Sequence, residues 1–147
     1  MYDLDYAKEW IKFAERDYAI ALHLSKTFRP LPMENICYGC QQSAEKSLKA
    51  ILAYNEDDIP KTHDIELLHQ LCQKYTDKIK LDIGITRALT RFATKSRYPD
   101  NVFDFTKEES ELGLKYAEQI LNKVKEVLKL PQDSIAENMD DKGNQDG

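Results

Sequence analysis

The chain has 147 residues, a length that fits one domain, and its 41% hydrophobic and 32% charged residues are typical of a globular protein with a charged surface. Five glycines and five prolines argue against a turn-rich β fold. Most of the net charge of −5 comes from residues 131–147, so the charges of residues 1–130 nearly balance. Because the sequence has neither a membrane-length apolar run nor a signal-peptide pattern, we expect a cytoplasmic protein.

Hydrophobic periodicity predicts a first helix over residues 4–26 and a break at Pro30 and Pro32. One stripe of this helix contains Tyr6, Trp10, Phe13, Asp17, Ile20, Ala21 and Leu24. Asp17 interrupts an otherwise apolar stripe. We interpret it either as a boundary residue paired with a nearby cation or as a carboxylate directed into a cleft between helices.

A second helix is predicted over residues 33–54, with Cys37, Cys40, Ala44, Leu48, Ile51 and Leu52 on its apolar face. A dense polar set lies beside that face: Gln41, Gln42, Glu45, Lys46 and Lys49. Glu45 precedes Lys49 by four residues, which is the favourable orientation for a helical ion pair. The set is either a solvated helix surface or part of a binding site.

A third helix is predicted over residues 63–75, with Thr62 as its N-cap. His63 would lie in its first turn, where the helix dipole disfavours protonation. The imidazole is then either a neutral group in a site or a cap for the end of a neighbouring helix.

Residues 78–84 are predicted to form a loop that leads into a fourth helix over residues 85–96. Arg87, Arg91 and Lys95 recur at four-residue steps on its polar face. This basic stripe is either a phosphate-binding surface or ordinary solubilising charge.

The segment Arg97-Tyr98-Pro99-Asp100 ends the fourth helix, because proline disfavours helical geometry at the residue before it. Thr106 and Glu109 form a predicted capping box for a fifth helix that reaches about Leu130. We expect a helical domain over residues 1–130, an all-α up-and-down antiparallel bundle of four to five helices, and a disordered acidic tail over residues 131–147.

Cys37, Cys40 and Cys72 are an odd number of cysteines in a chain without a secretion signal, so we expect reduced thiols. Cys37 with Cys40, and His69 with Cys72, have metal-ligand spacing. Both pairs lie in strongly helical segments, where buried structural thiols are commoner than zinc ligands. We therefore expect no metal and no cofactor.

Four segments together resemble the HEPN domain (higher eukaryotes and prokaryotes nucleotide-binding). The resemblance covers residues 4–128, and its most specific parts are the second-helix stretch and Arg97-Tyr98-Pro99-Asp100. The segments are Trp10-x3-Ala14-x2-Asp17, Tyr38-x2-Gln41-Gln42-x-Ala44-Glu45-Lys46-x-Leu48-Lys49-Ala50, Pro60-x-Thr62-His63-Asp64 and Arg97-Tyr98-Pro99-Asp100.

The resemblance implies a homodimer in which the second helix and the end of the fourth line a cleft near the twofold axis. It also implies either a toxin–antitoxin-like pair with a nucleotidyltransferase or a metal-independent ribonuclease. The candidate cleft residues are Gln41, Glu45, Lys49, His63, Arg97, Tyr98 and Asp100.

The sequence departs from the ribonuclease motif, in which four to six residues separate the arginine from a histidine. Arg97 matches the arginine, but Val102, Phe103 and Asp104 occupy the histidine positions. A proton-transfer group near neutral pH is best supplied by histidine. We therefore expect a non-catalytic protein that binds nucleotide, RNA phosphates or a partner nucleotidyltransferase. The alternatives are a ribonuclease toxin with a degenerate motif and a purely structural dimer.

Overall fold

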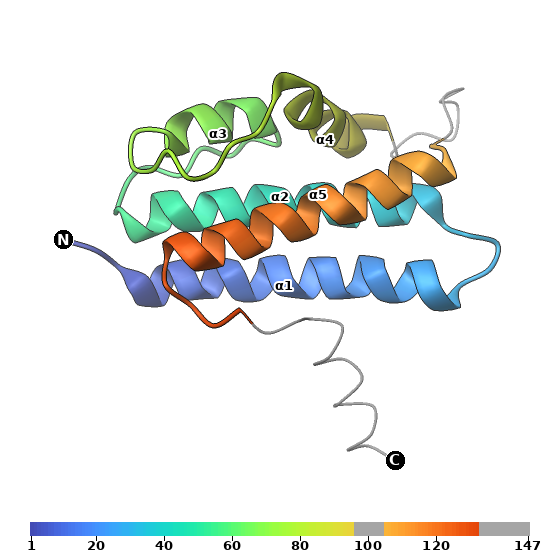
Figure 1. Cartoon of the computed structure of the whole chain (residues 1–147), viewed down its shortest axis with the longest axis horizontal. Helices are drawn as coiled ribbons and strands as arrows, with labels where there is room; N and C mark the ends of the chain where they lie inside the picture. The colour runs from blue at the N-terminus through green and yellow to red at the C-terminus, as the bar shows by residue number, and fades with distance from the viewer. Residues whose placement is uncertain (96–104, 133–147) are drawn as a thin grey trace, which may run out of the picture.

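The computed structural model describes residues 1–95 and 105–132, and in this part of the chain it contains five helices (Figure 1). The all-α prediction is confirmed. α2 lies at the centre of the bundle, with α1 on one side and α3 and α4 on the other, while α5 packs against both α1 and α2. The helices span Leu4–Thr27 (α1), Met33–Tyr54 (α2), Ile65–Cys72 (α3), Ile83–Lys95 (α4) and Lys107–Val127 (α5).

Small residues allow α1 and α2 to approach each other closely as an antiparallel pair. A Cβ at Gly39 would lie 3.1 Å from the Cβ of Ala21, so only glycine fits without a shift. The hydroxyl of Ser43 donates to the Ala14 carbonyl at 2.8 Å across the same contact. This close packing fixes the lateral position of α2, and therefore of the polar residues that follow Gly39 along it.

The apolar face that α1 buries differs from the predicted stripe. The buried residues are Ala7, Ile11, Ala14, Tyr18 and Ala21. Of the predicted stripe, only Ala21 is buried, and the side chains of Tyr6, Phe13 and Ile20 are exposed. The first helix has two apolar stripes at helical spacing, and the smaller residues form the buried one because α2 approaches so closely.

The third helix begins later and ends earlier than predicted. Asp64, rather than Thr62, is the N-cap, and its carboxylate accepts from the Leu67 amide at 3.1 Å. Thr62 instead accepts from the Asp64 amide, so it orders the turn before the helix. His63 consequently lies outside the helix.

At α5 the predicted capping box is confirmed, with Thr106 and Glu109 bonded reciprocally. The helix ends at Val127, three residues before the predicted limit. Lys129 has a φ of 59°, a left-handed conformation that cannot continue the helix. The predicted tail lies outside the described residues except for its first two, Pro131 and Gln132. None of the helices in the described ranges has the length and apolarity needed to cross a membrane.

Candidate functional site

α2 places Gln41, Glu45 and Lys49 on one line, because residues four apart fall on the same helix face. The Glu45 carboxylate accepts from Gln41 Nε2 at 3.0 Å and from Lys49 Nζ at 2.9 Å, on different oxygens. Glu45 is 4% exposed and Lys49 is 6% exposed, so this ion pair is buried in the protein rather than on its surface. The predicted ion pair is therefore present, but it is not the solvated helix surface that the spacing alone would suggest.

The loop before α3 brings His63 to the same carboxylate. Its Nδ1 lies 2.7 Å from Glu45 Oε1, and Gln41 Nε2 also donates to the His63 backbone carbonyl at 3.3 Å. Because an ionised carboxylate can only accept hydrogen bonds, Nδ1 carries the proton and Nε2 is the nitrogen that can exchange one. The His63 side chain is 52% exposed, so the imidazole reaches the protein surface. We call Gln41, Glu45, Lys49 and His63 the Glu45 cluster.

The pKa of Glu45 lies below its ordinary value. Burial opposes ionisation, but hydrogen bonds from Lys49, His63 and Gln41 outweigh it, and the charge of Lys49 adds to their effect. Glu45 is therefore ionised at neutral pH. The cluster contains one full negative charge, one full positive charge and an imidazole that the negative charge orients.

Aromatic residues of α1 form one border of the cluster. Lys49 Nζ lies 5.8 Å from the centroid of the Trp10 ring, and Lys46 Nζ lies 5.9 Å from that of Phe13. Lys46 also pairs with Asp17 at 2.5 Å, so Asp17 takes the first of its two predicted roles, a boundary residue paired with a cation. Sequence reasoning missed the contact of Trp10 with Lys49, because nothing local in the sequence indicates which α1 residues face α2.

Three of the predicted cleft residues, Arg97, Tyr98 and Asp100, lie outside the described residues. The other four form the Glu45 cluster. The amide of a residue not predicted as a ligand, Gln42, donates to Gln41 Oε1 at 2.7 Å and so fixes the orientation of the Gln41 carboxamide.

The guanidinium groups of the predicted basic stripe already face carboxylates. Arg91 pairs with Glu109 at 2.5 Å, and Arg87 lies 3.9 Å from Glu66. The side chain of Lys95 is outside the described part of the structure. A phosphate at Arg91 would have to displace Glu109, which makes this stripe a weaker anion site than its sequence suggests.

The three cysteines are buried free thiols. Cys72 donates to the Leu48 carbonyl at 3.3 Å, and His69 bonds the Ile79 carbonyl at 2.8 Å, so the two residues with ligand spacing bond backbone groups. Among the residues that the structure describes, no three His, Cys, Asp or Glu side chains are grouped to hold a metal ion.

Comparison with known proteins agrees with the all-α fold. The HEPN domain model matches residues 7–127, which is most of the chain. The chain belongs to the HEPN domain family. It is also 29% identical over 143 residues to a Methanocaldococcus jannaschii protein named Putative toxin MJ1304, covering 87% of this chain and 91% of that protein. No solved structure matches the chain significantly.

Replacing Glu45 tests the charge balance of the cluster. Glu45→Gln leaves the buried Lys49 ammonium without its counter-charge, and we expect a loss of about 3 kcal/mol in the free energy of unfolding at pH 7. Because the folded-state pKa of Glu45 is lowered, its stabilisation is complete above the ordinary carboxyl pKa and is lost as the pH falls through the folded-state value. Urea unfolding measured between pH 7 and pH 3 should show the free energies of unfolding of the wild-type protein and of Glu45→Gln approaching each other as the pH falls.

The matched control is Glu111→Gln on α5, where the carboxylate is 63% exposed and lies 3.8 Å from Lys107. Glu111→Gln should change the free energy of unfolding at pH 7 by no more than about 0.5 kcal/mol. Equal losses for both variants at pH 7 would contradict the buried ion pair.

Proposed function

We propose that this HEPN protein is a cytoplasmic, toxin-like partner of a nucleotidyltransferase that binds nucleotide or RNA phosphates and performs no chemistry itself. The observation that carries the proposal is the Glu45 cluster, a buried ion pair whose carboxylate contacts the half-exposed His63. Apolar residues of similar size would stabilise the bundle at least as well as a buried ion pair. The name of the similar M. jannaschii protein supports a toxin-like role.

In this proposal, Arg97 supplies the positive charge that contacts the phosphate, as its match to the HEPN motif implies, and Tyr98 and Asp100 shape the same cleft. His63 Nε2 provides a second polar contact at the mouth of the cluster. Because Glu45 and Lys49 neutralise each other, they orient the site rather than attract the anion.

Titration with ATP and with a short single-stranded RNA tests the binding role. We expect Arg97→Ala to weaken binding about tenfold or more, because a charge-assisted contact to phosphate is lost. Arg29→Ala removes an exposed arginine from the loop between α1 and α2 and should leave binding unchanged. Wild-type protein that binds neither ligand would refute a phosphate-binding role, and equal effects of the two variants would refute the role of Arg97.

The proposal includes a homodimer formed through the exposed stripe of α1. Tyr6, Phe13 and Ile20 are 44%, 48% and 54% exposed, and with Trp10 they follow the three-four spacing of a coiled-coil seam. Asp17 interrupts the stripe, but it is paired with Lys46, and a row of exposed apolar side chains on one helix face marks an interaction surface. Because Trp10 contacts Lys49, pairing through this stripe would bring two Glu45 clusters close to the dimer axis.

Sizing by light scattering tests this interface. Ile20→Asp places a charge in the stripe, and we expect the dimer to dissociate into monomers at micromolar concentration. Leu112→Asp introduces an aspartate at an exposed leucine of α5, outside the stripe, and should leave the dimer intact. A monomeric wild-type protein, or a dimer that survives Ile20→Asp, would contradict the proposed interface.

A specific observation favours a second candidate function, the metal-independent ribonuclease. Glu45 orients the half-exposed His63 through Nδ1 and leaves Nε2 free of that contact, which is the arrangement of a general acid–base group. His63 could take the proton of a ribose 2′-hydroxyl while the 2′-oxygen attacks phosphorus and the 5′-oxygen leaves, taking a proton from water. The products would be a 2′,3′-cyclic phosphate and a 5′-hydroxyl.

This candidate predicts RNA cleavage in the presence of EDTA, with a loss of about a hundredfold or more in His63→Gln. His23→Gln replaces an exposed histidine of α1 and should retain full activity. RNA that stays intact after long incubation at high protein concentration would exclude the ribonuclease, and the binding role would remain.

A further inference from the structure

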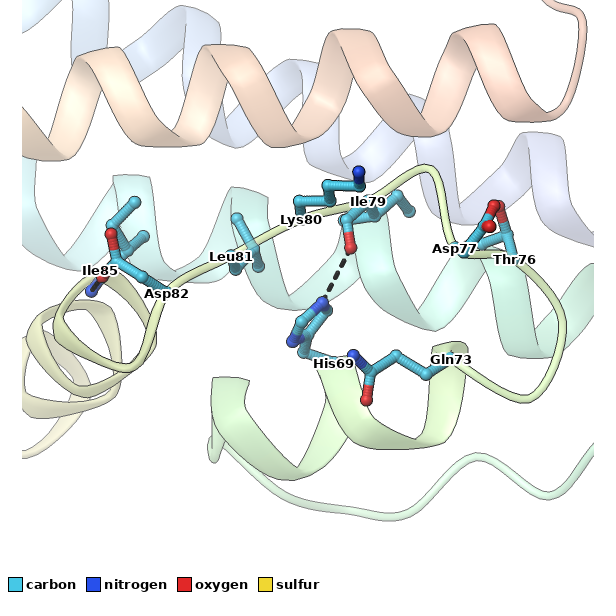
Figure 2. A pocket seen from close by; sticks show the side chains of 9 residues that line it. All are labelled: His69, Gln73, Thr76, Asp77, Ile79, Lys80, Leu81, Asp82 and Ile85. Carbon is cyan, nitrogen blue, oxygen red and sulfur yellow. Dashed lines mark hydrogen bonds between the residues drawn. The ribbon is translucent and has the colours of Figure 1, made fainter.

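A second polar site lies at a cavity of about 510 Å³ between α5 and the loop that connects α3 to α4. The loop contributes Lys78, Lys80 and Leu81 to the lining, and α5 contributes residues of the range 119–126. Figure 2 shows this loop, with the Lys80 side chain extending toward the α5 ribbon and His69 of α3 on the opposite side of the loop. The cavity shares no residue with the Glu45 cluster, so a ligand bound here is independent of the proposed function.

Positive charge dominates this lining. It contains three ammonium groups and one carboxylate, which give a net charge of +2. The carboxylate of Glu126 lies 3.2 Å from Lys123 Nζ, so these two groups neutralise each other. Within residues 1–95 and 105–132, neither Lys78 nor Lys80 has an ion-pair partner. The net charge therefore comes from two ammonium groups of the loop.

These lysines differ from the basic stripe of α4, whose guanidinium groups already face carboxylates of neighbouring helices. The loop has two carboxylates of its own, but neither Asp77 nor Asp82 lines this cavity. Asp82 instead accepts from a backbone amide at the start of α4, at 2.9 Å. An anion at Lys78 and Lys80 therefore gains charge-assisted hydrogen bonds without displacing a carboxylate.

Apolar residues form the floor of the same cavity. Ile120 of α5 and Ile79 of the loop are 1% and 3% exposed, and Leu81 and Ile85 are half-buried beside them. A bare ion would use the ammonium groups but would leave this apolar surface in contact with water. A ligand with both an anionic group and an apolar body would use both parts of the lining. The volume of the cavity is that of an ordinary small-molecule site.

We propose that this cavity binds a small organic anion, a carboxylate or phosphate carried on an apolar body. Lys78 and Lys80 donate to the anionic group, and the body packs on Leu81 and Ile120. Lysine suits this role because its ammonium is a point charge with three donors on a flexible stem, which pairs with either anionic group.

Probes that share one ring and differ in charge test this directly. Amide resonances of the uniformly ¹⁵N-labelled full chain are followed during titration with 3-phenylpropionate, with phenyl phosphate and with the uncharged 3-phenylpropan-1-ol. We expect saturable shifts at residues 78–85 and 119–126 with at least one anion, and roughly tenfold weaker binding of the alcohol. The tighter anion identifies the anionic group. Equal affinities for the alcohol and both anions, or no saturable shift with either anion at its solubility limit, would overturn the proposal.

Acetate and inorganic phosphate test the apolar half of the site, because they keep the charge and lack the ring. Each should bind roughly tenfold more weakly than the probe that carries the same anionic group on a ring. A bare anion that binds as tightly as its counterpart with a ring would refute the contact with the apolar floor.

Substitution of the two loop lysines identifies the contacts. Lys78→Gln combined with Lys80→Gln removes both ammonium groups at exposed positions, where the changes do not threaten folding. We expect the affinity for the tighter anion to fall about tenfold or more, while the alcohol binds as before. The matched control combines Lys8→Gln with Lys115→Gln, which changes the net charge equally at exposed lysines outside the cavity. Equal losses in the two double variants would show attraction by net charge alone and would overturn the proposal.

Glu126→Gln changes the affinity in the opposite direction. It removes the counter-charge of Lys123 and so adds a third ammonium that is available to the ligand, and we expect the anion to bind roughly threefold more tightly. Glu111→Gln makes the same charge change on α5 outside the cavity and should leave the affinity unchanged. If Glu126→Gln binds the anion as wild type does, the ligand does not lie beside α5 and the proposed site is wrong.

Discussion

The site of this protein depends on one buried carboxylate. Glu45 Oε1 accepts from Gln41 and lies against His63 Nδ1, while Oε2 accepts from Lys49. Burial raises the free energy of a charged carboxylate, and the hydrogen bonds from Lys49, His63 and Gln41 together offset that cost. The cluster thus joins α2 to the loop before α3 through one hydrogen-bonded network.

The packing of α1 connects this unit to the outer surface. Gly39 and Ala21 bring α1 so close to α2 that the rings of Trp10 and Phe13 lie over the ammonium groups of Lys49 and Lys46. The exposed stripe of α1 therefore borders the charged residues of α2. Any partner that covers the stripe will also change the environment of the cluster, so assembly and ligand binding are physically coupled in the proposed function.

Local patterns predicted the helices well. Hydrophobic periodicity predicted the long helices, and the capping box predicted the start of α5. The four-residue spacing predicted the ion pair between Glu45 and Lys49. All of these are interactions within one helix, so a few neighbouring residues contain the whole signal. The start of α3 was predicted wrongly because Thr62 and Asp64 are both competent caps, and only the path of the chain decides between them.

The assembly of the site could not be predicted in the same way. His63 and Glu45 are 18 residues apart and meet only because of how the loop after α2 returns. The choice between the two apolar stripes of α1 depends on the fit of small residues against α2, which periodicity does not express. The HEPN resemblance supplied the candidate residues, and the geometry showed that four of them form one hydrogen-bonded cluster.

The most direct test of the buried, ionised carboxylate is an NMR titration of the Glu45 side chain, followed by its carboxyl ¹³C shift in the full chain. We expect a midpoint below the ordinary glutamate pKa, because Lys49, His63 and Gln41 all stabilise the ionised form. A midpoint at or above the ordinary value would show that burial dominates, and that Glu45 does not hold His63 and Lys49 as an ionised carboxylate.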